Sequence, residues 1–156
     1  MNPWIFNTGA WSNRYHNING DGAVIQLTGS HWDPQPWTPR VAAWTVSEDW
    51  IINWRDYAVQ GWFNCRFGRS SQVSCGTVTS TGATITYSDG TTVGNMATST
   101  GCATGGDSGG SVVVDHGAVG VTSASTGSCP NPNATVVFTQ VRDIEYAMGV
   151  TVAHTP

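Results

Sequence analysis

One stretch of the chain combines a hydroxyl nucleophile with the backbone freedom that acyl transfer needs. Residues 102–114 read CATGGDSGGSVVV, with Ser108 at the centre of a run of glycines. A serine hydroxyl is a weak nucleophile and needs a base to take its proton. Glycine lets the backbone turn sharply, so the amides of Gly106 and Ser108 can face one point and form an oxyanion hole. A plain Gly-rich turn between two strands is the alternative. Asp107 is expected to hold the loop through an ion pair or hydrogen bonds.

This stretch resembles the nucleophile loop of chymotrypsin-fold serine proteases, and is most similar to the bacterial streptogrisin and α-lytic protease branch. Three further stretches share the resemblance: NCRFGRS at 64–70 with CGTV at 75–78, GVTSASTGSC at 120–129, and TVVFTQV at 135–141. In that branch they form a disulfide hairpin, the strand and loop of the specificity pocket, and the chain's ending. The resemblance is good over residues 57–152 and poor in the first third.

The chain has four cysteines, which allow three pairings. The resemblance implies Cys65–Cys75 and Cys102–Cys129. No Cys-x-x-Cys or histidine spacing supports a zinc site, and we expect no metal or organic cofactor.

Disulfides imply an oxidising compartment, so we expect a secreted protein. The first residues, MNPWIF, lack the features of a signal peptide, and we expect an upstream segment to have been removed.

Composition excludes several partners. Only 10% of the 156 residues are charged and none is lysine, so there is no basic patch for nucleic acid. No apolar run approaches the ~20 residues of a membrane helix. The net charge of −4 indicates no particular partner.

The spacing of short β-type runs predicts an all-β fold, a barrel or a sandwich. The runs are 57–64, 74–80, 83–88, 91–97, 111–114, 118–123 and 135–140, preceded by strand candidates at 21–27 and 41–46. Residues 28–40 indicate a connector, and 47–56 a connector or a helical turn. Residues 141–148 predict the one helix, with Gly149 as its stop.

The resemblance implies a chymotrypsin-like antiparallel β-barrel. We predict that residues 57–156 form a complete C-terminal barrel, with the nucleophile loop and a short C-terminal helix. Residues 1–56 would be a Trp-rich remnant of the N-terminal barrel and the connector. All eight tryptophans lie between Trp4 and Trp62. They either pack a small barrel and its interface, or form a surface that docks another chain, a propeptide or a polysaccharide.

A serine nucleophile needs an imidazole and an acid that orients it. Asp21 opens the run DGAVIQL at 21–27, which resembles the acid-bearing strand of the family, although Asp-Gly is also a common turn dipeptide. The family's histidine lies upstream of that acid, and no segment here matches it. His16, His31, His116 and His154 are the candidates. None of these four is expected to be the base. We therefore expect that the base lies in a segment absent from this chain, that a second chain or propeptide supplies it, or that it was lost in a non-catalytic relative.

The resemblance also implies the substrate site. Thr122, Ser123, Ala124 and Ser125 would form the edge strand on which an extended polypeptide pairs. Many relatives have two glycines where Ala124 and Ser125 stand, so we expect a narrower pocket that favours a small or polar residue. No acid is present to attract Arg or Lys, and a glutamate-directed relative would need a histidine near Thr122. Residues 133–135 are expected to form the far wall.

These observations predict a secreted serine endopeptidase that acts through an acyl-enzyme on Ser108. The alternative is a non-catalytic, protease-like binding or assembly module that uses its Trp-rich N-terminal third. An esterase is disfavoured because its nucleophile elbow leads into a helix, whereas SVVV at 111–114 continues as a strand.

Overall fold

The computed structural model describes residues 11–17, 20–25, 40–41 and 50–155, with side chains for Val41 and residues 50–155. Six strands make up most of this part: β6 (Phe63–Gly68), β7 (Gln72–Thr86), β8 (Thr92–Thr100), β9 (Ser111–Val114), β10 (Gly117–Ser125) and β11 (Thr135–Gln140). The chain ends in the helix α1 (Val141–Met148). The all-β expectation with one short C-terminal helix is therefore confirmed.

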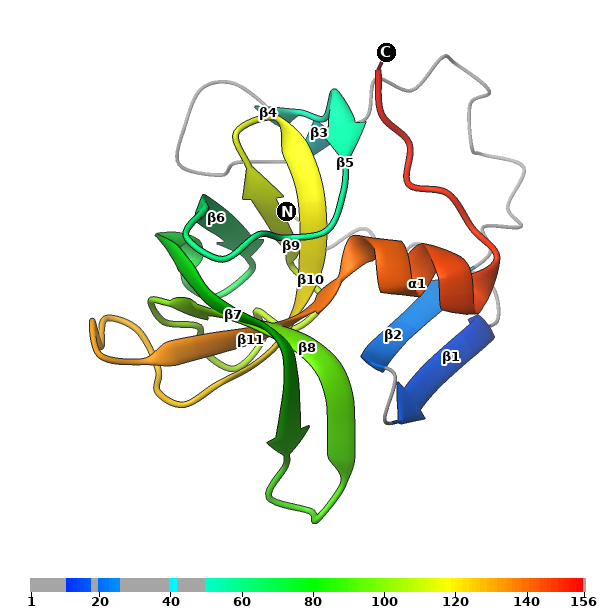
Figure 1. The fold of residues 1–156 in the computed structure, drawn as a ribbon. Coiled ribbons are helices and arrows are strands. Elements are labelled where there is room, and N and C mark those ends of the chain that lie inside the picture. Colours follow the sequence, from blue (N-terminus) through cyan, green and yellow to red (C-terminus); the bar gives the residue numbers. More distant parts are fainter. Residues whose placement is uncertain (1–10, 18–19, 26–39, 42–49, 156) are drawn as a thin grey trace, which may run out of the picture.

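The six strands form a closed, antiparallel ring (Figure 1). Their order is β11-β8-β7-β6-β9-β10, and β10 pairs back onto β11. The interior is filled by apolar side chains that alternate along the strands, among them Phe138, Val112 and Val119, each 0% exposed. Because neighbouring strands pair all around the ring, residues far apart in sequence meet at its rim, where the nucleophile loop joins β8 to β9.

Further strands accompany the ring in the described part of the chain. They are β1 (Trp11–Asn17) with β2 (Gly20–Ile25), β3 (Arg40–Val41) with β4 (Trp50–Ile51), and β5 (Trp54–Arg55), which pairs in parallel with β10. The β1–β2 hairpin lies against α1 and β8 (Figure 1). The strand expected at 21–27 is thus described as far as Ile25, and most of the one expected at 41–46 lies outside the described residues.

Several boundaries differ from the prediction. The run at 57–64 becomes a strand only at Phe63, because residues 59–62 form a turn in which the Trp62 N–H donates to the Val59 carbonyl (3.1 Å). The runs at 74–80 and 83–88 form one bent strand, β7, whose register shifts where it passes residues 80–83. The ambiguous segment 47–56 contributes β4 and β5 rather than a helical turn.

The helix at 141–148 begins and ends as predicted. Its amphipathic face buries Val141 and Ile144 against the ring. Gly149 follows in the left-handed conformation with φ 65°, and its N–H donates to the Glu145 carbonyl. That conformation is one that glycine adopts without strain, which is why it terminates the helix. No helix in the described part of the chain is long and apolar enough to cross a membrane.

Candidate active site

Ser108 lies at the exposed tip of the loop that joins β8 to β9. Two tight turns shape this loop: the Asp107 N–H donates to the Thr104 carbonyl (3.0 Å), and the Gly110 N–H donates to the Asp107 carbonyl (2.9 Å). Gly106 has φ 100°, a conformation that L side chains rarely adopt. The turns therefore point Asp107 inward and leave its two neighbours at the surface.

The amides on either side of Asp107 are available to a ligand. Within the part of the chain that the structure describes, neither the Gly106 N–H nor the Ser108 N–H donates to any acceptor. The Asp107 N–H between them is used inside the loop. Two amide donors on either side of Asp107, one of them that of Ser108 itself, thus have no acceptor among the described residues, and a developing oxyanion requires such a pair of donors.

The loop is fastened to β10. The Gly109 N–H donates to the Thr122 carbonyl and the Thr122 N–H donates to the Gly110 carbonyl, both at 2.8 Å. The Ser108 hydroxyl donates to the Ser123 carbonyl (3.1 Å). These bonds hold the nucleophile beside the strand on which we expect substrate to pair.

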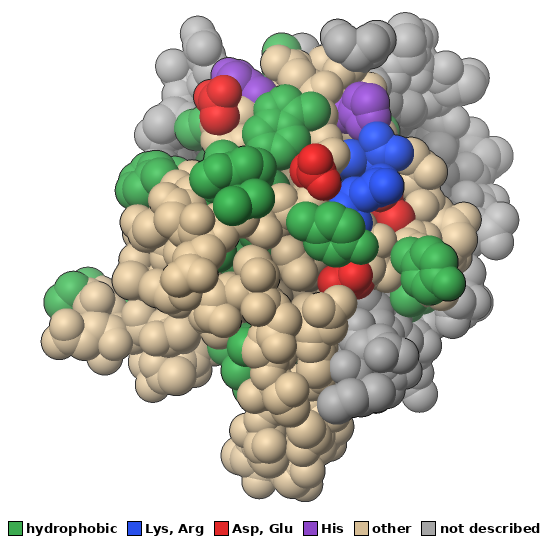
Figure 2. All heavy atoms as spheres, viewed as in Figure 1, with side chains coloured by type: hydrophobic (Ala, Val, Ile, Leu, Met, Phe, Trp, Pro, Cys, Tyr) green, Lys and Arg blue, Asp and Glu red, His purple; other side chains and the backbone are tan. Residues whose placement is uncertain are grey.

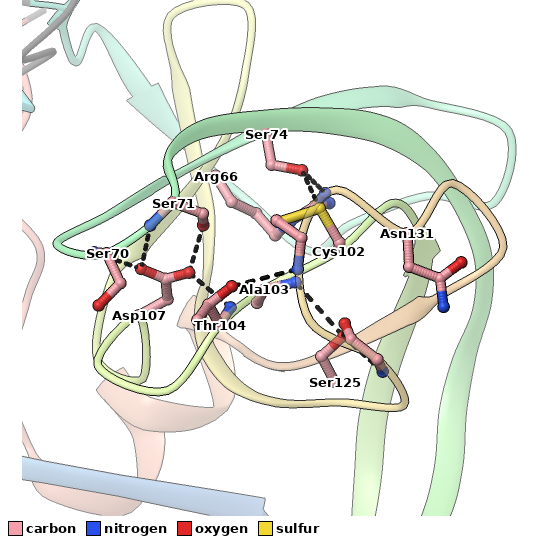
Figure 3. Close-up of a disulfide and its surroundings, with 12 residues drawn as sticks. Arg66, Ser70, Ser71, Ser74, Cys102, Ala103, Thr104, Asp107, Ser125 and Asn131 are labelled. Atoms are coloured by element: carbon pink, nitrogen blue, oxygen red, sulfur yellow. Dashed lines mark hydrogen bonds between the residues drawn. A yellow bond between two sulfur atoms is a disulfide. The ribbon is translucent and has the colours of Figure 1, made fainter.

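Asp107 anchors the buried side of the loop through hydrogen bonds (Figure 3). The residue is 3% exposed, and its carboxylate accepts from the Ser70 N–H (2.7 Å), the Ser71 N–H (3.0 Å), the Thr104 N–H (2.8 Å) and the Ser71 hydroxyl. Burial raises the pKa of Asp107, but these donors outweigh it and hold the pKa below its usual value. Asp107 is therefore ionised at neutral pH and ties the nucleophile loop to the turn between β6 and β7.

A buried arginine supports the entrance to the same loop (Figure 3). Arg66, 3% exposed, donates from Nη1 and Nη2 to four neutral oxygens: Asn64 Oδ1 (3.1 Å), Ser99 Oγ (2.9 Å), the Thr100 carbonyl (3.3 Å) and Ser74 Oγ (2.9 Å). In the described part of the chain it forms no ion pair with a carboxylate. Burial lowers its pKa to about 10, so it remains charged at neutral pH.

The four cysteines form the two disulfides that the resemblance implies, Cys65–Cys75 and Cys102–Cys129. The first closes the β6–β7 hairpin, in which these two residues stand opposite each other. The second joins the start of the nucleophile loop to the loop that follows β10. The described residues contain no group of three His, Cys, Asp or Glu side chains that could hold a metal ion.

A hollow of about 410 Å³ opens beside Ser108. Its lining consists of glycine, alanine and hydroxyl residues: Ala103, Thr104, Gly105, Ser108, Thr122, Ala124, Ser125, Thr126, Gly127 and Ser128. None of these side chains is ionisable. Ser123, whose hydroxyl bonds to the Tyr87 hydroxyl (2.6 Å), contributes its backbone to the site rather than a side chain to the lining. The wall expected from residues 133–135 is formed instead by residues 126–128.

The two histidines with described side chains lie far from Ser108. His116 precedes β10 and bonds through Nδ1 to the Ile51 carbonyl (2.9 Å). The strand from Gly117 to Ser123 spans about 20 Å, so His116 cannot reach the nucleophile. His154 receives a hydrogen bond from Arg55 Nη1 (2.6 Å), and Arg55 pairs with Ala118 near the same end of β10. On the face of the molecule drawn in Figure 2, one histidine side chain lies beside arginine side chains and another lies apart from them.

The acid candidate, Asp21, lies in β2. Its backbone stands directly opposite His16 of β1 in the antiparallel register. The side chains of both residues, and all of His31, lie outside the described residues. Among the side chains that the structure describes, no histidine and carboxylate join Ser108 in a triad.

Comparison with known proteins gives a consistent result. The family model described as Trypsin matches residues 5–148. Among curated proteins, the chain is 32% identical over 124 residues to Streptogrisin-C of Streptomyces griseus, covering 80% of this chain and 26% of that protein. It is 38% identical over 95 residues to Glutamyl endopeptidase 2 of the same organism, covering 61% of this chain and 50% of that protein. The chain thus spans from about a quarter to half of these relatives.

Solved structures show the same likeness. The chymotrypsin of Cellulomonas bogoriensis superposes with a TM-score of 0.77 at 31% identity, covering 88% of this chain and 71% of that one. A glutamic acid specific serine protease, described as using a histidine triad in substrate binding, gives a TM-score of 0.76 at 29% identity, covering 90% and 72%. Both likenesses extend over most of this chain and confirm the chymotrypsin-like fold.

Proposed function

Because the chain belongs to the trypsin family, we propose that it is a serine endopeptidase whose nucleophile is Ser108. The Ser108 hydroxyl attacks the carbonyl carbon of the scissile peptide bond while a base takes its proton. The tetrahedral intermediate then expels the amine, to which the base returns the proton, and leaves an ester on Ser108. Water, activated by the same base, hydrolyses that ester and restores the hydroxyl.

One observation carries this proposal. An exposed serine hydroxyl is flanked by two exposed amides that have no acceptor among the described residues, Gly106 and Ser108, while the Asp107 amide between them is used inside the loop. A donor pair that is already oriented stabilises the oxyanion without reorganisation, and loss of one such donor costs about 10²–10³ in kcat.

The proposed acid and base lie outside the described side chains. Asp21 is the proposed acid, which would hold the imidazole in its reactive tautomer and stabilise the imidazolium. The proposed base is a histidine carried by a polypeptide segment beyond these 156 residues, either of the same protein or of a partner or propeptide. His116 and His154 are engaged at the other end of β10 and do not serve.

The proposed substrate is a polypeptide with a small or polar residue before the cleaved bond. It pairs in an extended form with residues 122–125 and places that residue in the hollow beside Ser108. Ala124 and Ser125 narrow this hollow, and its lining offers hydroxyls but no charge. Thr122 in place of a histidine argues against the glutamate specificity that two relatives' names indicate. The two disulfides favour secretion.

Two divisions of the chain are part of the proposal. Residues 57–156 are proposed to form the nucleophile-bearing second barrel with the C-terminal helix, and residues 1–56 to form the Trp-rich remnant of the first barrel and the connector.

A non-catalytic binding module is the second candidate. The bond from the Ser108 hydroxyl to the Ser123 carbonyl favours it, since that hydroxyl has no imidazole partner among the described residues.

Active-site labelling separates the two candidates. A fluorophosphonate reacts rapidly only with a serine that has a working base, and intact mass detects the adduct. We expect labelling at Ser108 in protein isolated from its source, and none in the Ser108→Ala variant. Labelling of the 156-residue chain by itself would place a base within these residues. No labelling in any preparation would refute the endopeptidase and leave the binding module.

A further inference from the structure

The peptide unit between Gly105 and Gly106 carries one of the two proposed oxyanion donors and is weakly restrained. Neither residue has a Cβ, and one added to Gly105 would meet nothing within 4 Å. Inverting this unit would turn the Gly106 N–H away and bring the Gly105 carbonyl into its place. It would also move φ of Gly106 by about 180°, from its present 100° into the ordinary negative region, which glycine occupies equally well. Side-chain sterics at these two glycines therefore do not select the observed orientation.

A single hydrogen bond holds this unit in the described structure. The Ser70 hydroxyl, from the turn between β6 and β7, donates to the Gly105 carbonyl at 2.7 Å. No other donor to that carbonyl is present among the described residues, and the Gly106 N–H has no acceptor there. The same hydroxyl lies under Gly106, where an added Cβ would come within 2.5 Å of it.

The rest of the loop is held independently of this bond. Asp107 accepts from the backbone amides of Ser70 and Ser71, from Thr104 and from the Ser71 hydroxyl. Those contacts fix the loop on the far side of Gly106, and removing the Ser70 hydroxyl leaves all four in place. Loss of the hydroxyl therefore releases the Gly105–Gly106 unit without releasing Asp107.

From this geometry we propose that Ser70 is a positioning residue that selects the orientation of the Gly105–Gly106 peptide and so keeps the oxyanion hole open. Ser70 does not touch substrate, and it acts only through the Gly105 carbonyl. The inference rests on the proposed function for its effect on rate. The orientation of the peptide can be observed without catalysis.

The test compares five forms of the protein: the parent, Ser70→Ala, Ser70→Thr, a matched control and the reference variant Gly106→Ala. Thr79→Val is the control because it removes an exposed hydroxyl of β7 whose bond is to the Thr98 hydroxyl (2.8 Å). Crystal structures report the orientation of the Gly105 carbonyl. Rates of fluorophosphonate labelling and of peptide hydrolysis report the state of the oxyanion hole. Gly106→Ala disfavours the observed φ, so its rates of labelling and hydrolysis are those expected for a protein with the inverted peptide.

We expect the Ser70→Ala crystals to contain the inverted peptide, alone or mixed with the observed form. Labelling rate and kcat should fall about five- to tenfold, the effect of losing one neutral hydrogen bond, with KM unchanged. Ser70→Thr should restore the labelling rate and kcat, and Thr79→Val should match the parent. An unchanged peptide orientation in Ser70→Ala would overturn the inference, whatever the rates. If the parent itself were not labelled but the peptide inverted, the positioning role of Ser70 would stand and the proposed function would fail.

Discussion

The substitution Asp107→Asn tests how the nucleophile loop is anchored. An asparagine can still accept from the Ser70 and Ser71 amides through its carbonyl oxygen. Its amide group, however, would face the Thr104 N–H, which now donates to Asp107 Oδ2 at 2.8 Å. Two donors would then oppose each other in a site where the native residue is 3% exposed.

The size of the effect follows from these contacts. A buried N–H left without an acceptor costs about 1–3 kcal/mol, and the remaining bonds lose the extra strength that a charged acceptor provides, about 1 kcal/mol. We expect the free energy of unfolding to fall by about 3 kcal/mol. That is less than the total stability of a typical domain, about 5–15 kcal/mol, so the variant should still fold.

The pH dependence distinguishes this cause from a packing defect. The folded-state pKa of Asp107 lies below the ordinary value of 3.8, so its stabilisation is fully present above pH 3.8. It is lost as the pH falls through the folded-state pKa. Because the asparagine of the variant cannot ionise, the parent should lose stability with falling pH more steeply than Asp107→Asn below pH 3.8, and the gap between them should narrow.

Urea unfolding is followed by tryptophan fluorescence at a series of pH values, from neutral to below 3.8. It measures the loss of unfolding free energy in Asp107→Asn and the change of that loss with pH. Asp115→Asn is the matched control, since Asp115 is exposed and has φ 50°, a conformation that asparagine also tolerates. The control should unfold like the parent. A loss in Asp107→Asn below about 1 kcal/mol, or a gap that stays constant over the pH range, would refute the anchoring argument.

Three further predictions concern other parts of the molecule. Ala124→Gly should widen the hollow beside Ser108 and raise kcat/KM for a phenylalanine over an alanine peptide about tenfold, measured with paired substrates. Glu145→Gln should lower the free energy of unfolding by about 2 kcal/mol, because the carboxylate accepts from Arg55 Nε (2.5 Å), from Arg142 Nη1 (2.5 Å) and from the Val152 amide (2.7 Å). Burial opposes these donors, but they hold the pKa of Glu145 below 4.5, so the gap should narrow only below that pH. Gly149→Ala should cost about 1 kcal/mol by urea unfolding, since φ is 65° there.

Local sequence signals predicted the fold well where they were strong. The β-type runs from residue 74 onward form strands, and the helix at 141–148 forms with its glycine stop. The boundaries failed where tertiary pairing overrides local preference. The glycine at position 82 suggested a break, yet β8 pairs along both halves of β7 and keeps it one strand. The turn at 59–62 is fixed by a bond from the Gly61 N–H to the Val78 carbonyl (2.9 Å), a partner that no local pattern reveals.

At the candidate site, too, the local sequence predicted some features and could not predict the tertiary contacts. The GGDSGG run at 105–110 was enough to predict Ser108 as the nucleophile and the two amides proposed for the oxyanion hole. It could not reveal that the loop is held by the turn around Ser70, because that contact joins residues 35 positions apart in sequence. A serine pair after an arginine, in Arg69-Ser70-Ser71, carried no signal by itself. Nor could the sequence predict that Arg66 is buried among neutral oxygens rather than paired with a carboxylate.

The most direct test of the central claim is fluorophosphonate labelling of the protein from its source, with the modified residue located by mass spectrometry. We expect a single adduct, at Ser108, that is absent from Ser108→Ala. We also expect the 156-residue chain alone to react several orders of magnitude more slowly, because the proposed base lies on another segment. An unlabelled Ser108 in the source protein would refute its role as the nucleophile.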